Sequence, residues 1–185
     1  RVKRFVLSFL ALGALCASSV PASAQERGNV GLVIAMPTDV GVIWHVNENI
    51  AVRPEINFSF GSGEIEGLGT TVDTSGRGYS VETSVLFYLA SLDGVRTYVA
   101  PRVGFDWSSS DNNDSDDDVS SNGMEVSVSY GAEYAPVSRF SIFGEIGLEY
   151  ARGTAELDPG LGIESRVSSW GPRTQVGVIV YFGGI

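Results

Sequence analysis

The sequence has 185 residues, a formal net charge of −10 and a single cysteine. This length corresponds to one domain. The acidic balance excludes binding to nucleic acid by charge, because such a chain repels phosphates, and one cysteine excludes both a disulfide framework and a metal site built on several thiolates.

The N-terminal region has the pattern of a secretory signal peptide. A basic start is followed by an apolar run that ends near Ala17 and by an A-x-A cleavage pattern at 22–24. The run is too short for a membrane-spanning helix. A buried helix would leave the basic start unexplained, and a lipoprotein anchor at Cys16 would follow an unusually bulky residue. We therefore predict a signal peptide at 1–24 and one domain at 25–185, with nine basic and 22 acidic residues and a net charge of −13.

Two short apolar segments open this domain. Gly28–Met36 and Val40–Val46 are predicted as antiparallel strands joined by a turn at 37–39. One long bent strand over 29–46 is the alternative and would give seven strands in the chain. We prefer eight, because an even number places both chain ends on the same side of a closed sheet.

The rest of the chain alternates apolar and polar residues with period two, as strands do. From Ile50 to Gly61, apolar side chains occupy the even positions and polar or small ones occupy the odd positions. The same alternation recurs at 79–89, 95–107, 124–135, 140–151 and 166–182. These six strands complete a predicted set of eight.

The connections between these strands alternate in length. Short turns are predicted at 47–49, 91–94 and 136–138, and long polar loops at about 62–77, 108–123 and 152–165. This rhythm is typical of bacterial outer-membrane barrels, which have tight periplasmic turns and longer outer loops.

The apolar face carries its aromatic residues in two groups. Near the loops these are Phe58, Phe60, Tyr79, Phe105, Trp107, Tyr150 and Trp170, and near the turns they are Trp44, Phe87, Tyr134, Phe140 and Phe182. Two aromatic girdles around an aliphatic band are expected at two membrane–water interfaces. We therefore predict that the apolar face points outward to lipid; the alternative is a soluble barrel with an apolar core. Because Pro54, Pro101 and Pro172 lie on this face and cannot donate a backbone hydrogen bond, local bulges are predicted there.

The polar face carries charges of both signs. They are Arg53, Glu55, Glu82, Arg102, Glu133, Glu145, Glu149 and Arg173. One interpretation is an ion path or a ligand contact through the lumen. A network of ion pairs that fills a narrow interior is favoured, because a buried charge must be paired. No catalytic, cofactor-binding or metal-binding residues are predicted.

Two further features, the acidic stretch 109–121 and His45, suggest cation binding and enzymatic activity, but their sequence patterns do not support either. The acidic stretch 109–121 has oxygen ligands suited to a divalent cation, but it lacks the spacing of an EF-hand loop. We interpret it as a solvated outer loop. His45, the only histidine, is predicted at the inward periplasmic end of its strand. A lipid-modifying enzyme would need it at the outer leaflet, together with a serine and a carboxylate.

The sequence combines the eight-strand rhythm and the signal-peptide pattern with the segments Tyr98–Gly104, Phe143–Leu148 and Gly177–Phe182. In these features it resembles the small outer-membrane β-barrel domain family. This family includes OmpA-barrel-like, OmpX-like and OmpW-like proteins. The resemblance implies an all-β, eight-stranded, antiparallel up-and-down transmembrane barrel in the cell outer membrane. It also implies that outer-membrane lipids and lipopolysaccharide surround the chain, and that the barrel-assembly machinery reads Phe182 during insertion.

We expect a structural or surface-interaction role, in which the barrel anchors exposed acidic loops, for a protein that is not an enzyme and has no cofactor. The external ligand is not indicated by the sequence. The alternative is a narrow channel or carrier for small or hydrophobic solutes, as OmpW-like proteins suggest. A lipid-modifying enzyme is the third hypothesis.

Overall fold

The computed structural model describes residues 29–67, 70–112, 119–158 and 163–182. The signal peptide predicted at 1–24 lies outside these residues. Within the described part of the chain, no helix is long and apolar enough to cross a membrane.

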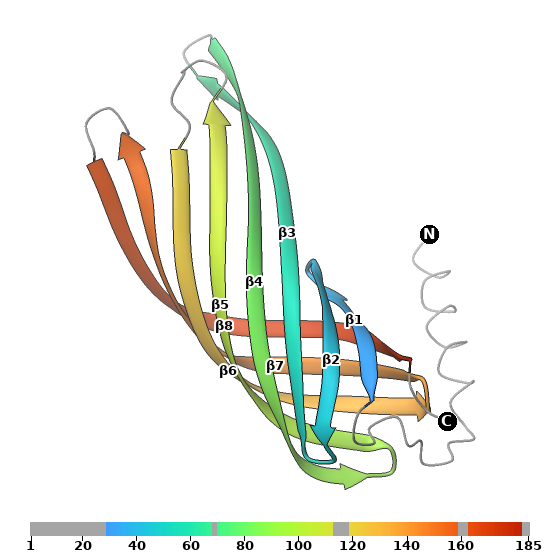
Figure 1. Cartoon of the computed structure of the whole chain (residues 1–185). Coiled ribbons are helices and arrows are strands. Elements are labelled where there is room, and N and C mark those ends of the chain that lie inside the picture. The colour runs from blue at the N-terminus through green and yellow to red at the C-terminus, as the bar shows by residue number, and fades with distance from the viewer. Residues whose placement is uncertain (1–28, 68–69, 113–118, 159–162, 183–185) are drawn as a thin grey trace, which may run out of the picture.

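Eight antiparallel strands make up the described chain. Their bounds are β1 (Val30–Met36), β2 (Asp39–Asn47), β3 (Ile50–Gly67), β4 (Thr70–Leu92), β5 (Val95–Asn112), β6 (Val119–Val137), β7 (Phe140–Asp158) and β8 (Ile163–Tyr181). Each strand pairs with the next and β8 pairs with β1, so the sheet closes into an up-and-down barrel (Figure 1). The predicted eight strands are confirmed. A single strand over 29–46 is excluded, because the chain turns at Pro37 and Thr38.

The short turns predicted from the sequence are confirmed. They connect β2 to β3, β4 to β5 and β6 to β7. In the β4–β5 turn, Asp93 and Gly94 have φ angles of 50° and 80°. Positive φ at both central residues is the geometry of a type I′ turn, whose twist matches that of the flanking strands.

The long loops predicted at 62–77, 108–123 and 152–165 are wrong in extent, because strands continue through most of these segments. β3 and β4, for example, stay paired as far as Gly67 and Thr70. Alternation of apolar and polar side chains marks a strand whose two faces have different surroundings. Where both faces meet water, the backbone pairing continues without that pattern.

The bulges predicted at the prolines are also wrong. Pro54, Pro101 and Pro172 pair in unshifted register with Thr83, Val128 and Leu148. On the other side of Pro54 and Pro101 the pairing is interrupted and then resumes in the same register. Each proline therefore removes one donor without inserting a residue. The register shifts lie elsewhere, between His45 and Asn47, Tyr88 and Ala90, Tyr134 and Val137, and Glu156 and Asp158.

The first hairpin is much shorter than the others. β1 has 7 residues and β2 has 9, whereas β3 to β8 have 18 to 23. Pairing of β2 with β3 ends at Asp39 and Asn57, and pairing of β1 with β8 ends at Met36 and Val176. Above these residues β3 and β8 have a partner on one side only. We call this break in the upper wall the notch; in Figure 1, β1 and β2 end far below the tops of β3 and β4.

The register of the ring has the stagger of a tilted barrel. From Asn57, pairing through β2 and β1 reaches β8 at Gly177. Pairing in the other direction, through β4 to β7, reaches β8 at Val167. The two routes meet β8 at different heights, as closure with tilted strands requires.

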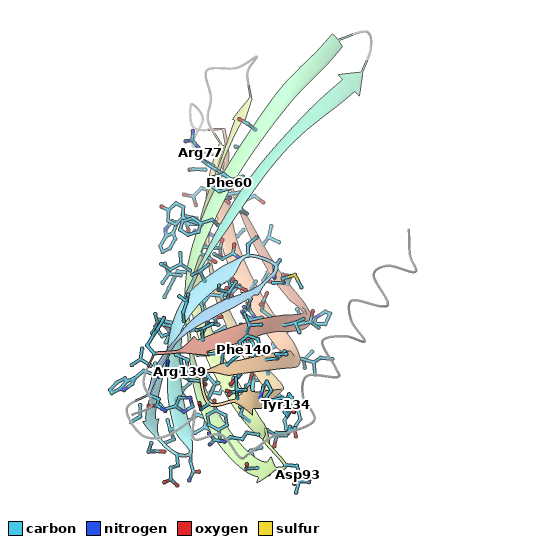
Figure 2. All side chains as sticks on the ribbon, turned by 90° about the vertical axis from the view of Figure 1, so that its right-hand side faces the viewer. Phe60, Arg77, Asp93, Tyr134, Arg139 and Phe140 are labelled. Atoms are coloured by element: carbon cyan, nitrogen blue, oxygen red, sulfur yellow. The ribbon has the colours of Figure 1, made fainter. Side chains whose placement is uncertain are left out.

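The two faces of the barrel have the predicted orientation. Outward aliphatic side chains are widely exposed, such as Ile146 at 64% and Leu148 at 62%, whereas Arg53 on the opposite face is 0% exposed. In Figure 2, Phe60 lies toward one end of the barrel, and Tyr134 and Phe140 lie toward the other. The soluble alternative, with its apolar face inside, is therefore wrong.

A glycine in the wall makes room for a buried ring. A Cβ atom at Gly131 would lie 2.5 Å from Tyr98 Cζ, whereas a Cβ at the lumen-facing Gly171 would meet nothing within 4 Å. We expect Gly131→Val to destabilise the barrel by roughly 1–3 kcal/mol through overpacking, and Gly171→Val to leave stability nearly unchanged. Urea unfolding in lipid vesicles and the folded band on unboiled gels measure both. Equal losses in the two variants would contradict this account.

Candidate functional site: the charged interior of the barrel

The middle of the lumen is filled by two buried arginines that share their partners. Arg53 Nη2 lies 2.6 Å from Glu145 Oε1, and Arg53 Nε lies 3.1 Å from Glu55 Oε2. Arg102 Nη2 lies 3.1 Å from Glu145 Oε2 and 3.4 Å from Glu55 Oε2. Both guanidinium groups also donate to Gln175 Oε1, at 3.3 and 3.0 Å. These side chains come from β3, β5, β7 and β8, so the middle layer ties opposite walls together.

Neutral groups add further hydrogen bonds to this layer. Gln175 Nε2 donates to Asp39 Oδ2 at 2.9 Å and to Glu55 Oε1 at 3.0 Å. Tyr98 donates its hydroxyl to Glu145 Oε1 at 2.8 Å. Because Gln175 both accepts from the arginines and donates to the carboxylates, it joins like-charged groups without adding a charge.

The upper layer is built around Arg173. Its Nη2 lies 2.6 Å from Glu82 Oε2, and its Nη1 lies 2.7 Å from Glu149 Oε2 and 3.1 Å from Glu125 Oε1. Arg102 Nη1 lies 3.5 Å from Glu82 Oε2 and so connects the two layers. The upper layer is the more open one, since the side chain of Glu149 is 26% exposed.

The lower layer, at the turn end, centres on one carboxylate. Glu133 accepts hydrogen bonds from the hydroxyls of Tyr88 at 2.7 Å and Tyr181 at 2.9 Å. His45 Nε2 lies 3.2 Å from the Tyr181 hydroxyl. The Arg96 guanidinium lies over the Tyr88 ring, 3.7 Å from its centroid, where a cation–π contact is favourable. This layer separates the charged middle of the lumen from the periplasmic turns.

Parity along the strands explains why so many charges meet inside. Successive side chains of a strand point to opposite faces, so an apolar outer face directs every intervening polar residue into the lumen. Eight strands leave an interior that side chains can fill. Small residues provide the remaining room: a Cβ atom at Gly104 would lie 2.9 Å from Glu125 Oε1 and from Glu82 Cγ.

The structure brings together all the charges that the sequence singled out. Arg53, Glu55, Glu82, Arg102, Glu133, Glu145, Glu149 and Arg173 all lie in these three layers. Sequence reasoning missed Asp39, Glu125, Gln175, Arg96 and the tyrosines Tyr88, Tyr98 and Tyr181. Glu125 has the same parity as Glu133 and could have been found from it. The tyrosines also lie on the polar face, and parity alone does not indicate which acceptor each hydroxyl reaches.

The remaining candidate residues lie apart from this network or at its edge. His45 is fully buried, so it does not reach the lipid around the barrel. Of the acidic stretch 109–121, residues 113–118 lie outside the described chain and the flanks belong to β5 and β6. Among the described residues, no group of three or more His, Cys, Asp or Glu could hold a metal ion. Phe182 follows β8, is 69% exposed, and donates its N–H to the Val30 carbonyl at 2.9 Å.

Removal of one charge from the middle layer tests its role in stability. We expect Arg53→Met to lower the free energy of unfolding by roughly 3–5 kcal/mol, because Glu145 and Glu55 lose a buried partner. The double variant Arg53→Met/Glu145→Gln should recover part of this loss. Arg166→Met is the matched control, because its pair with Glu164 spans 3.7 Å and is exposed. Urea unfolding in vesicles, followed by tryptophan fluorescence, measures all three. A loss at position 53 no larger than that at 166 would contradict the buried network.

Comparison with known proteins gives the same fold. No family model and no curated protein matches the sequence. A major outer membrane protein from Thermus thermophilus aligns with a TM-score of 0.56 and 16% identity, over 83% of this chain and 98% of that one. The N-terminal β-barrel domain of Pseudomonas aeruginosa OprF aligns with a TM-score of 0.50 and 15% identity, over 85% of this chain and 100% of that one. At these identities the likeness concerns the fold.

Fold and surface together settle where this barrel resides. Its outward face is an apolar belt that water would not stabilise. In the lower barrel its closed ring of strands pairs the backbone groups that lipid cannot satisfy. The expected location in the cell outer membrane is confirmed. The chain is thus a small, eight-stranded transmembrane β-barrel of the outer-membrane type.

Proposed function

We propose that this barrel is a membrane anchor for a surface-interaction site formed by three projecting hairpins. The observation that carries the proposal is the continuation of β3 to β8 beyond the outer aromatic residues. β3 and β4 pair from Phe58 and Tyr79 to Gly67 and Thr70. The β5–β6 and β7–β8 pairs likewise continue beyond the aromatic level.

The size of the projection supports a role outside the membrane. At about 3.3 Å per residue, the β3 segment from Phe58 to Gly67 extends about 30 Å along the strand. In Figure 2, β3 and β4 continue together well beyond the rest of the barrel. Paired strands present a preformed surface, and less ordering is required on binding than for a flexible loop of the same length.

The charge of these hairpins indicates the chemistry of a partner. The segments 62–74 and 109–121 contain Glu64, Glu66, Asp73 and a run of aspartates. Such a surface attracts a basic partner, or an anionic one through bridging cations, and it repels a bare polyanion. We therefore favour a cationic surface on the partner.

The interior supports the anchor over the channel. An ion that crossed the lumen would have to displace side chains such as Arg53 and Glu133, which are fully buried and hydrogen-bonded across the barrel. Breaking such a network costs several kcal/mol for each stranded charge. The three layers therefore act as a plug in this proposal.

Planar-bilayer recordings test the plug. We expect the purified barrel to show no stable conductance, because three side-chain layers fill its lumen. Arg102→Ala should give at most brief openings, and the exposed Arg166→Ala should match the unmodified chain. A stable conductance of the unmodified chain that Arg102→Ala abolishes would overturn the plug and favour the channel.

A shortened hairpin tests the surface role. Ser62 and Ser75 face each other across β3 and β4, so replacing 63–74 by Asn-Gly closes the pair with a type I′ turn and keeps the register. A second variant replaces 111–118 between Ser110 and Val119 on β5 and β6 in the same way and removes the run of aspartates. We expect both variants to insert and keep the folded gel band.

The readouts are adhesion of expressing cells to cultured epithelial cells, cell–cell sedimentation, and resistance of the envelope to detergent. The shortened β3–β4 hairpin should lower adhesion or sedimentation and leave detergent resistance intact. If deletion of the whole chain changes only detergent resistance, and the shortened chain restores it, the role is structural and the surface proposal is wrong.

A further inference from the structure

The outward face of β3 to β6 changes in character row by row toward the outer end. Cross-strand pairing aligns four residues in each row. The apolar row contains Ile56, Val81, Phe105 and Met124. The aromatic row above it contains Phe58, Tyr79 and Trp107, with Asn122 beside them. The polar row above that contains Arg77, Ser109 and Ser120, with the exposed Phe60 beside them. Toward the outer end, the surface thus changes from apolar side chains to mostly aromatic rings, and then to an arginine and two serines beside an exposed phenylalanine.

The aromatic and polar rows form a groove rather than a flat wall. Tyr79 and Trp107 stack with ring centroids 5.3 Å apart, and they line an outward groove of about 430 Å³ together with Phe58 and Phe60. Among the described residues that line this groove, Arg77 carries the charge. Figure 2 shows Phe60 and Arg77 close together at the upper end of the barrel.

A smaller version of this arrangement occurs on β7 and β8. Leu148 pairs with Pro172, Tyr150 pairs with Trp170, and Arg152 pairs with Ser168 one row further out. The Tyr150 and Trp170 rings have centroids 4.9 Å apart. An arginine one row beyond an aromatic pair therefore recurs on another part of the barrel wall.

The order of these rows matches the parts of an anionic membrane lipid. Acyl chains favour the apolar row, and aromatic rings favour the interface between hydrocarbon and headgroups. A guanidinium group forms a two-pronged hydrogen bond with phosphate. Serine hydroxyls and an asparagine amide beside it can pair with sugar hydroxyls. The predicted domain has a net charge of −13. The exposed Arg77 is therefore a local positive charge on an acidic chain, and it can attract an anionic group.

We propose that the groove on β3 to β6 binds a phosphorylated, multiply acylated glycolipid of the outer leaflet. Arg77 contacts its phosphate, and an acyl chain lies along Phe58, Tyr79 and Trp107. The four-strand width of the face, about 14 Å at 4.8 Å between strands, suits a lipid with several chains better than a two-chain phospholipid. This site is separate from the tips of the projecting hairpins and does not depend on what they bind.

Native mass spectrometry of the intact barrel, released from detergent micelles, tests the proposal. The probes are diphosphorylated lipid A, the same lipid after removal of its phosphates, and phosphatidylglycerol. The variants are Arg77→Ala, Arg77→Lys and, as a control, Arg139→Ala, which removes an exposed arginine at the opposite end of the barrel (Figure 2). The folded band on unboiled gels verifies that each variant has inserted correctly.

We expect the unmodified barrel to retain diphosphorylated lipid A in preference to the other two probes. Arg77→Ala should weaken this retention about tenfold, the effect of losing a charge-assisted hydrogen bond. Arg77→Lys should keep most of it, and Arg139→Ala should not change it. Equal losses in Arg77→Ala and Arg139→Ala would overturn the site. Equal retention of the dephosphorylated lipid would overturn the phosphate contact, and equal retention of phosphatidylglycerol would overturn the lipid class.

Discussion

The structure depends on one constraint: a backbone in lipid must satisfy its own hydrogen bonds, because hydrocarbon offers no partner. Closure of β1 on β8 meets this constraint in the lower part of the barrel. Closure also determines which side chains point inward. Because the outer face is apolar, each intervening side chain lies in the narrow lumen. On β3 the ring is incomplete above Asn57, next to the outer aromatic residue Phe58, where water and lipid headgroups can serve as partners. On β8, among the described strands, the edge lacks a backbone partner already above Val176, beside the lipid-facing pair Leu148 and Pro172.

The interior shows how a charged core is tolerated in such a barrel. The middle arginines each contact more than one carboxylate, and Gln175 and Tyr98 supply neutral hydrogen bonds between them. A buried ion pair contributes little net stability compared with a well-packed apolar pair, but loss of one partner is severe. A single substitution in the network is therefore expected to lower stability. The same contacts hold strands that are distant in sequence at fixed separations.

Much of the fold could be predicted from sequence because lipid imposes a pattern. The alternation from Ile50 to Gly61 exists because one face meets hydrocarbon, and the same parity identified the lumen charges. The alternation fades beyond the membrane, so the sequence predicts a loop where the ends of β3 and β4 are in fact paired. The partners within the lumen could not be predicted, because the contact between Arg53 and Glu145 depends on the tilt and register of the whole ring. Parity also places Tyr98 on the inward face, but it does not reveal that the Tyr98 hydroxyl donates to Glu145.

The notch gives the two halves of the molecule different mechanical freedom. Below Asn57 and Val176, backbone pairing around a full circle fixes the cross-section. Above them, no pairing joins β3 to β8 among the strands that the structure describes. The spacing between the β3–β4 and β7–β8 hairpins can therefore widen or narrow by bending, without the loss of backbone hydrogen bonds between β3 and β8. In the proposed surface role, the outer hairpins can adjust their span to a partner, while the closed ring beneath them keeps its shape.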